Sequence, residues 1–231
     1  MKREKPQINV KLKKGESALD VLVDADVKRT VVYGYYFDDE TVQHLTINGV
    51  EVSGCMFINC RFQDCLFEGV SFLNCYFKNC DFSFMNMHQG SFTCCEIVES
   101  KLTGLNLSFG VLNNVLIRTT SCRYVNFSEV KMTVVKFVSC DMTSSDVDKV
   151  RLKESEFVQC NMTEMNICGT SFEGMNLRGN RLDKLIFMGG ELQGATVDSA
   201  QAIGLIRLMG ILVDDNGSPA YGQGANRKRF E

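Results

Sequence analysis

The eleven cysteines are the side chains of this sequence with the greatest capacity for chemistry, because a thiolate binds metals and attacks electrophiles. Zinc-binding cysteines usually come in C-x-x-C pairs, and the chain contains no such pair. Eight cysteines instead recur at positions that differ by multiples of five: Cys55, Cys60, Cys65, Cys75, Cys80, Cys95, Cys140 and Cys160. This regular spacing indicates core-filling thiols, so we predict no metal site.

The other three cysteines depart from that spacing. Cys122 takes the place of a large core residue in the pattern described below. Cys94 and Cys168 fall at positions predicted to face outward, where exposure allows a thiol to react. The sequence leaves their reactivity open, although an incidental surface thiol is the simpler interpretation.

The two histidines and the carboxylates form no catalytic motif. His44 and His88 are predicted on different faces and too far apart to share a site. Neither has a serine, cysteine or carboxylate partner at the spacing of a known motif, and phosphate-loop, zinc-protease, esterase and dinucleotide fingerprints are absent. We therefore predict that the protein is not an enzyme, binds no cofactor and has no small-molecule substrate.

A period of five residues organises the chain. Every fifth residue is apolar in an unbroken run of 31 positions from Ile47 to Val197. Five matches neither the helical period of about 3.6 nor the strand period of 2, so the chain must turn a corner in every unit. The residue two places before each of these positions is mostly small, and the remaining three are mostly polar. One large and one small inward side chain per unit predict a narrow, densely filled coil.

Clear examples of the five-residue unit are CRFQD (60–64), CDFSF (80–84), CNMTE (160–164) and MNLRG (175–179). Their tandem A-(D/N)-L-x-x pattern resembles the pentapeptide-repeat proteins, with Qnr- and MfpA-like members most similar in overall plan. This resemblance implies an all-β solenoid, a right-handed quadrilateral β-helix with 20 residues in each square coil. About eight coils are then expected, with a short N-terminal cap and a C-terminal helix.

The segments outside the repeats predict a domain plan. We expect an N-terminal cap over residues 1–40, with a strand at Ile8 to Leu12 and a short helix after Ser17, and the β-helix over residues 41–199. Residues 200–213 should form a capping helix and strand, and residues 214–231 a flexible tail. The resemblance implies that the helix pairs two subunits tail to tail, through a set of apolar residues: Ile203, Leu205, Ile206, Leu208 and Met209.

Charge and hydropathy add two surface hypotheses. Residues 30–199 carry 13 basic and 20 acidic groups, a net charge of −7. One predicted face holds a candidate partner surface of carboxylates: Glu68, Glu129, Asp146 and Asp148. Another holds a candidate apolar strip: Ile58, Val98, Val138 and Val158. The simpler interpretations are a slightly anionic soluble surface for the first and ordinary β-branched strand residues for the second.

Two functional interpretations follow from different classes. The first, implied by the resemblance, is a non-enzymatic DNA mimic that binds DNA gyrase or topoisomerase IV and protects against fluoroquinolones. The alternative is a structural or protein-protein interaction module with an unknown partner. No direct nucleic-acid binding is expected from an acidic rod, and the absence of a signal pattern or an 18-residue apolar run predicts a cytoplasmic protein without a membrane segment.

Overall fold

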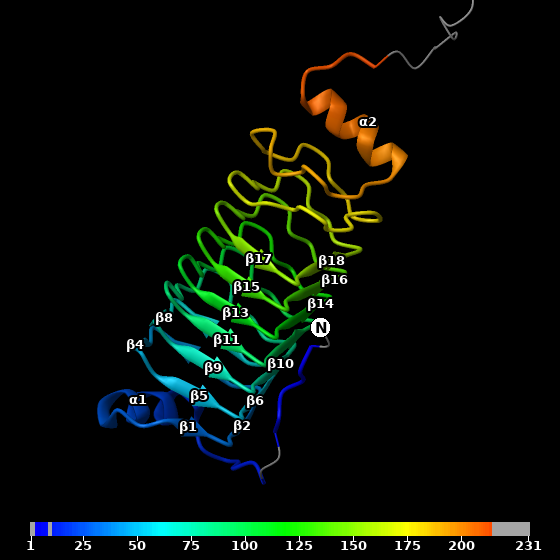
Figure 1. Ribbon diagram of the computed structural model, residues 1–231. Helices are drawn as coiled ribbons and strands as arrows, with labels where there is room; N and C mark the ends of the chain where they lie inside the picture. The colour runs from blue at the N-terminus through cyan, green and yellow to red at the C-terminus, as the bar shows by residue number, and fades with distance from the viewer. Residues whose placement is uncertain (1–2, 9–10, 214–231) are drawn as a thin grey trace, which may run out of the picture.

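The computed structural model describes residues 3–8 and 11–213, and it is a right-handed rod of stacked square coils with a helix at each end (Figure 1). Each coil is built from 20 residues, since every strand pairs in parallel register with residues 20 positions later, as in Phe57 with Phe77. The corners between the sides take left-handed backbone conformations, with φ near 55° at Asn59 and 52° at Asp64. Glycine, asparagine and aspartate tolerate this region best, which explains their frequency there.

Two of the four faces are continuous parallel sheets of seven strands. The β1 face contains β1 (Val32–Tyr33), β5 (Glu51–Ser53), β9 (Ser71–Leu73), β11 (Ser91–Thr93), β13 (Val111–Asn113), β15 (Lys131–Thr133) and β17 (Arg151–Lys153). The β2 face contains β2 (Tyr36–Asp38), β6 (Met56–Ile58), β10 (Tyr76–Lys78), β12 (Glu96–Val98), β14 (Leu116–Arg118), β16 (Lys136–Val138) and β18 (Glu156–Val158). Residues 32–38, which lie within the predicted cap, therefore already pair with the next coil.

The other two faces begin as paired strands and continue as turns joined by single bridges. The β3 face starts with β3 (Thr41–Gln43) and β7 (Arg61–Gln63), and the β4 face with β4 (Thr46–Asn48) and β8 (Leu66–Glu68). Beyond these strands the units form turns with a hydrogen bond inside the turn. For example, the Leu105 N–H donates to the Leu102 carbonyl at 2.9 Å. The β4 face thereafter carries one isolated bridge per coil, such as Asn86 with Asn106.

The lumen is filled by the five-residue repeat. Phenylalanines from successive coils stack, with ring centroids 5.0 Å apart for Phe57 and Phe77 and 4.9 Å apart for Phe62 and Phe82. The eight regularly spaced cysteines and Cys122 are all buried beside them, as free thiols. Burying each such aromatic side chain contributes on the order of 2 kcal/mol. The predicted fold class, a quadrilateral β-solenoid with large and small inward residues, is confirmed.

The expected count of about eight coils is too high. Seven strands per sheet correspond to about six turns with regular pairing, which end at Val158. Beyond that point the chain still coils, but only through isolated bridges such as Asn176 with Thr196. The last coil is distorted because the Glu191 side chain turns inward and its carboxylate accepts hydrogen bonds from the N–H groups of Gly169, Met188 and Gly189 at 3.0, 3.0 and 2.9 Å. The five-residue apolar pattern continues through this region and gives no sign of the change.

The N-terminal end is covered by α1 (Ala18–Lys28), which buries Ala18, Val21, Leu22 and Ala25 against the first coil. Ser17 is its N-cap, without a side-chain hydrogen bond to the helix. The predicted strand at Ile8 to Leu12 includes residues 9–10, which lie outside the described residues. Further upstream, the Gln7 N–H donates to the Asn74 Oδ1 at 3.3 Å, so this segment runs along the side of the rod (Figure 1).

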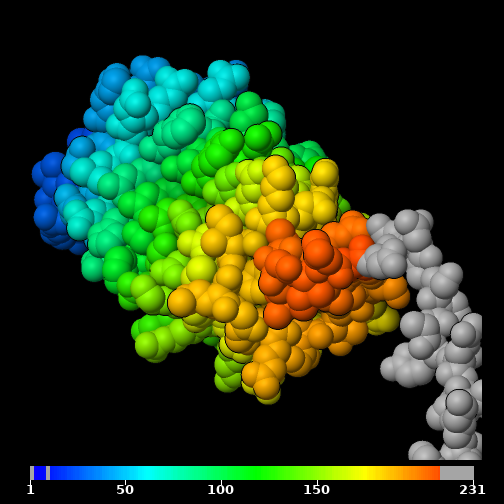
Figure 2. All heavy atoms as spheres, turned by 90° about the horizontal axis from the view of Figure 1, so that it is seen from above, coloured from blue at the N-terminus to red at the C-terminus, as the bar shows by residue number. Residues whose placement is uncertain are grey.

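The C-terminal end carries α2 (Ser199–Leu208), which lies across the last coil (Figure 2). Asp198 is its N-cap, since the Asp198 carboxylate accepts from the Gln201 N–H and the Gln201 side chain accepts from the Asp198 N–H. Residues 211–213 form no strand, and the predicted tail of residues 214–231 lies outside the described residues. None of the α2 residues is fully buried, so the contact between α2 and the rod covers the helix only in part.

Candidate interaction faces

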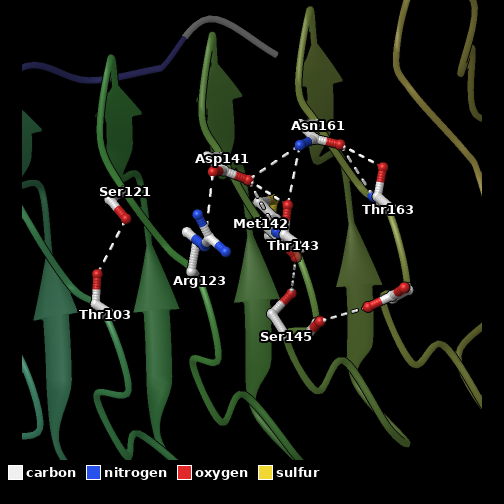
Figure 3. Close-up of polar contacts among 11 residues, drawn as sticks. Thr103, Ser121, Arg123, Asp141, Met142, Thr143, Ser145, Asn161 and Thr163 are labelled. Carbon is white, nitrogen blue, oxygen red and sulfur yellow. Dashed lines mark hydrogen bonds and ion pairs between the residues drawn. The ribbon is translucent and has the colours of Figure 1, made fainter.

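The β3 face carries a ladder of polar side chains that bond from one coil to the next (Figure 3). The Asn161 Nδ2 donates to the Asp141 Oδ1 at 3.2 Å and to the Thr143 Oγ1 at 2.9 Å. The Thr143 and Thr163 hydroxyls each donate to the Asx side chain two residues earlier, at 2.5 and 2.6 Å. Arg123 reaches Asp141 from the preceding coil at 3.9 Å. Because these polar groups bond mainly to one another, the ladder stabilises the wall of the rod and leaves few acceptors free for a ligand.

The four predicted partner-surface carboxylates all project from the β4 face or its corner. Glu68, Glu129 and Asp146 are exposed, and Asp148 is half-buried beside Lys149 at 3.3 Å. Glu129, Asp146 and Asp148 lie on adjacent coils, whereas Glu68 lies three coils before Glu129, or about 14 Å at the usual strand spacing. The structure therefore brings three of the four together.

The candidate apolar strip on the β2 face is shorter than the sequence suggested. Ile58, Val138 and Val158 are half-buried at outward positions, but Val98 is only 1% exposed. The N-terminal segment crosses the rod at this height, where Arg3 forms an ion pair with Glu96 on the same strand as Val98. Val98 is therefore not available to a partner in this structure, and the strip is interrupted at its second position.

Both histidines have partners that a search for local motifs cannot find. The His88 Nδ1 lies 3.0 Å from the Ser108 Oγ, and the His44 Nδ1 lies 3.8 Å from an Asp64 carboxylate oxygen. Each partner is 20 residues later, one coil on. Ser108 also donates to the Asn106 Oδ1 at 2.8 Å, so the pair belongs to a hydrogen-bonded ladder. The two histidines do not approach each other, as expected.

The two outward cysteines are weak nucleophiles in their present surroundings. Burial and the nearby Glu4 carboxylate raise the pKa of the Cys94 thiol, whose sulfur lies 3.8 Å from a Glu4 oxygen. Burial and the Glu191 and Asp148 carboxylates raise the pKa of the Cys168 thiol. Because the thiolate is the reactive form, both thiols are less reactive than an ordinary surface cysteine near neutral pH.

The described residues offer no site for chemistry of other kinds. In residues 3–8 and 11–213, no group of three or more histidines, cysteines, aspartates or glutamates is placed to hold a metal ion. An open depression of about 560 Å³ lies beside α1, lined by residues that include Lys13, Glu16 and Asp20. Neither α1 nor α2 is long and apolar enough to cross a membrane.

The apolar residues predicted for a dimer interface divide between two environments. Leu205 packs against the core of the rod. The other four are exposed on α2 and directly after it, by 40% for Ile203, 37% for Ile206, 42% for Leu208 and 62% for Met209. Leu212 follows with 98% exposure. The C-terminal end of the molecule therefore presents an uncovered apolar surface.

Sequence reasoning missed one feature of the β4 face. Phe84, Phe109 and Tyr124 occupy corners at its two edges and are 77, 51 and 55% exposed. A search for the five-residue core pattern treats corner positions as wall and ignores which residue stands there. The available signal was the presence of aromatic residues at corners that otherwise hold mostly glycine or polar residues.

Comparison with known proteins agrees with the architecture. A family model described as "Pentapeptide repeat region" matches residues 130–202, and one described as "Pentapeptide repeats (8 copies)" matches residues 55–93. A search of curated protein sequences found no significant match.

Three solved structures align with this chain at low sequence identity. A trypsin-treated variant of QnrB1, a plasmid-mediated fluoroquinolone resistance protein, is 21% identical over 78% of this chain and 97% of that one, with a TM-score of 0.46. Full-length QnrB1 is 18% identical over 77% and 99%, with a TM-score of 0.39. HetL, a pentapeptide repeat protein involved in heterocyst differentiation regulation from the cyanobacterium Nostoc sp. strain PCC 7120, is 12% identical over 71% and 90%, with a TM-score of 0.24.

The repeats seen in the sequence, the square coil that they build and the two family matches agree on one assignment. The chain belongs to the pentapeptide-repeat family.

Proposed function

We propose that this protein is a non-enzymatic binding protein whose acidic β4 face takes the place of DNA on DNA gyrase or topoisomerase IV. The observation that carries the proposal is the position of Glu129, Asp146 and Asp148 on adjacent coils of one face. Occupation of the enzyme by such a rod in place of DNA would also lower its sensitivity to fluoroquinolones.

The electrostatics favour reversible binding. Duplex DNA carries one negative charge per roughly 1.7 Å, whereas the coils of this rod are about 4.8 Å apart. The carboxylates of this face stand on only three coils, at Glu68, at Glu129, and at Asp146 with Asp148. A mimic with a lower charge density competes with DNA most effectively at low ionic strength, where attraction is least screened. Binding should therefore weaken steeply between low and physiological salt.

We further propose a homodimer formed by the C-terminal ends. Ile203, Ile206 and Leu208 are exposed on α2, and an isologous contact about a two-fold axis would cover them with an identical patch. Tail-to-tail pairing would double the length of the acidic rod, and thus the length of enzyme surface that it can follow.

A supercoiling assay tests the topoisomerase proposal. Purified protein should inhibit DNA gyrase at low salt, and the triple change Glu129→Lys, Asp146→Lys and Asp148→Lys should abolish inhibition. The control is the triple change Glu51→Lys, Glu99→Lys and Glu173→Lys, which alters the net charge equally at other exposed positions. Equal loss of activity in both variants would mean that net charge, and not the β4 face, is responsible.

The alternative is an interaction module for an unknown partner. The polar ladder of the β3 face favours it, because its side chains hydrogen-bond to one another. A rigid wall without reactive groups suits a spacer or scaffold as well as a mimic. Lack of any effect of the purified protein on gyrase or topoisomerase IV, at low salt and with or without a fluoroquinolone, would support this alternative.

A further inference from the structure

The two edges of the β4 face carry exposed aromatic side chains that the lumen does not use. Phe84 and Tyr124 stand in one corner column, two coils apart, and Phe109 stands in the opposite column. All three have positive φ, of 60°, 58° and 60°. An aromatic residue in this backbone region is strained relative to glycine or asparagine, and its exposed ring gains little from burial. Other corner residues, such as Val134 with φ of 55°, adopt the same conformation, so the exposure of the three aromatic rings is what sets them apart.

Neighbouring residues hold two of these rings in defined positions. The Phe84 ring lies over Gly104, where an added Cβ would meet ring atoms at 2.6 and 2.8 Å. The Phe109 ring stands edge-on to His88, with ring centroids 5.4 Å apart. Between the two corner columns, the Asn106 Nδ2 donates to the Asn86 Oδ1 at 3.0 Å. The face is therefore a polar floor flanked by fixed aromatic rings.

The charge around these rings is strongly unbalanced. Between Asp64 and Gly169, this face and its two corners bear the carboxylates Asp64, Glu68, Glu129, Asp146, Asp148 and Glu164 and a single lysine, Lys149. That lysine already pairs with Asp148 at 3.3 Å, and Lys184 on the following coil pairs with Glu164 at 3.0 Å. The Arg123 guanidinium carbon lies over the Tyr124 ring, 5.6 Å from its centroid, and the guanidinium also pairs with Asp141. One of the three rings therefore already has an arginine of this chain within cation–π distance.

We propose that the β4 face, with Phe84, Phe109 and Tyr124, is a docking surface for a partner protein that presents arginine side chains. The guanidinium plane stacks on an exposed aromatic ring and pairs with a carboxylate at the same time, which the compact lysine ammonium does less well. The aromatic rings supply preference for arginine, and the carboxylates supply the attraction of charge. The inference rests on the binding role proposed for this face, but not on topoisomerase as the partner.

Two peptides of equal charge test the surface without knowledge of the partner. Binding of fluorescent octa-arginine and octa-lysine to the full chain is measured by anisotropy at low salt. We expect octa-arginine to bind about five-fold more tightly. The triple change Phe84→Leu, Phe109→Leu and Tyr124→Leu should lower the affinity for octa-arginine to the level of octa-lysine and leave octa-lysine binding unchanged, because the carboxylates remain. Thermal unfolding of the variant should match the wild type, since all three side chains are exposed.

A matched control uses Tyr33→Leu, because Tyr33 is 51% exposed on the β1 face. It should keep the preference for arginine. Equal affinity of the wild type for both peptides, or a preference that survives the triple change, overturns the inference.

The same variants in the gyrase assay separate the two proposals. A preference for arginine that needs the three aromatic residues, in a protein without effect on gyrase, supports this docking surface and contradicts the topoisomerase proposal. Gyrase inhibition by a protein that binds both peptides equally supports the topoisomerase proposal and contradicts this docking surface.

Discussion

The position of a residue within the five-residue unit determines whether its side chain lies in the lumen or on the wall of the rod. Asn180 illustrates the rule, since this buried amide at a small inward position satisfies itself on backbone: its Oδ1 accepts from the Cys160 N–H at 2.8 Å, and its Nδ2 donates to the Phe157 and Leu177 carbonyls. A polar residue is tolerated in the lumen only with such a full set of partners.

Phe137 provides the corresponding test in the apolar part of the lumen. It is fully buried and stacks on Phe157 with centroids 5.1 Å apart, so Phe137→Asp places an unpaired carboxylate in a dry core. We expect a loss of at least about 4 kcal/mol in the free energy of unfolding, measured by chemical denaturation. Lys136→Gln is the control, because it removes only an exposed pair with Glu156 and should cost at most about 1 kcal/mol. Similar losses in the two variants would show that the inward register is wrong.

Glu191 gives the last coil a dependence on pH. Burial opposes its ionisation, but hydrogen bonds from the Gly169, Gly189 and Met188 N–H groups outweigh that effect and lower its pKa. A carboxyl group whose pKa is lower in the folded state stabilises the fold above its unfolded pKa, and this contribution disappears as the pH falls through the folded pKa.

We therefore expect Glu191→Gln to be less stable than the wild type at pH 7, and the difference between their melting temperatures to shrink as the pH falls below about 4. Differential scanning calorimetry across this range checks the prediction. A difference that stays constant with pH would show that the carboxylate charge is not involved.

Each five-residue unit supplies one side of the coil and the corner that follows it. Deletion of Ser139, a corner residue with φ of 52°, moves every later side chain to the wrong place relative to the lumen. Deletion of the whole unit from Ser139 to Thr143 keeps the alternation of inward and outward residues and shifts only the faces. We expect the unit deletion to unfold cooperatively and the single deletion to lose most of its structure, by circular dichroism and thermal melts. A cooperative single-residue deletion would contradict a continuous coil.

The sequence predicted the elements that repeat and missed those that depend on neighbouring coils. Inward positions such as Phe57 and Cys55 were identifiable because the period alone places them. The pairing of His88 with Ser108 was not, because a 20-residue coil brings the two positions close but does not decide which outward side chains bond to each other. The number of coils was overestimated because Phe172 and Leu177 keep the period and are buried, although the strands of both sheets end at β17 and β18.

At the scale of the molecule, the two ends of the rod differ in how completely a helix covers them. The N-terminal helix α1 buries four residues against the first coil, whereas α2 buries none. An open solenoid end exposes unpaired backbone and invites self-association. The dimer and the partner surface remain predictions, because they depend on contacts with other molecules.

The exposed side of α2 allows a direct test of the dimer. Ile206→Asp and Leu208→Asp together should yield a folded monomer, since the two side chains are 37 and 42% exposed and neither packs against the core. Leu205 is left unchanged because it packs against the core. Light scattering at tens of micromolar should give the mass of two chains for the wild type and of one for the variant. A monomeric wild type at that concentration would rule out the proposed interface.

Displacement of DNA from gyrase tests the central claim most directly. A fluorescent DNA duplex bound to purified gyrase is titrated with this protein at low and at physiological salt, and anisotropy reports the bound DNA. The account predicts competitive displacement that weakens as salt rises, and that is lost when Glu129, Asp146 and Asp148 are changed to lysine. Simultaneous binding of DNA and this protein, or no displacement at low salt, would contradict it.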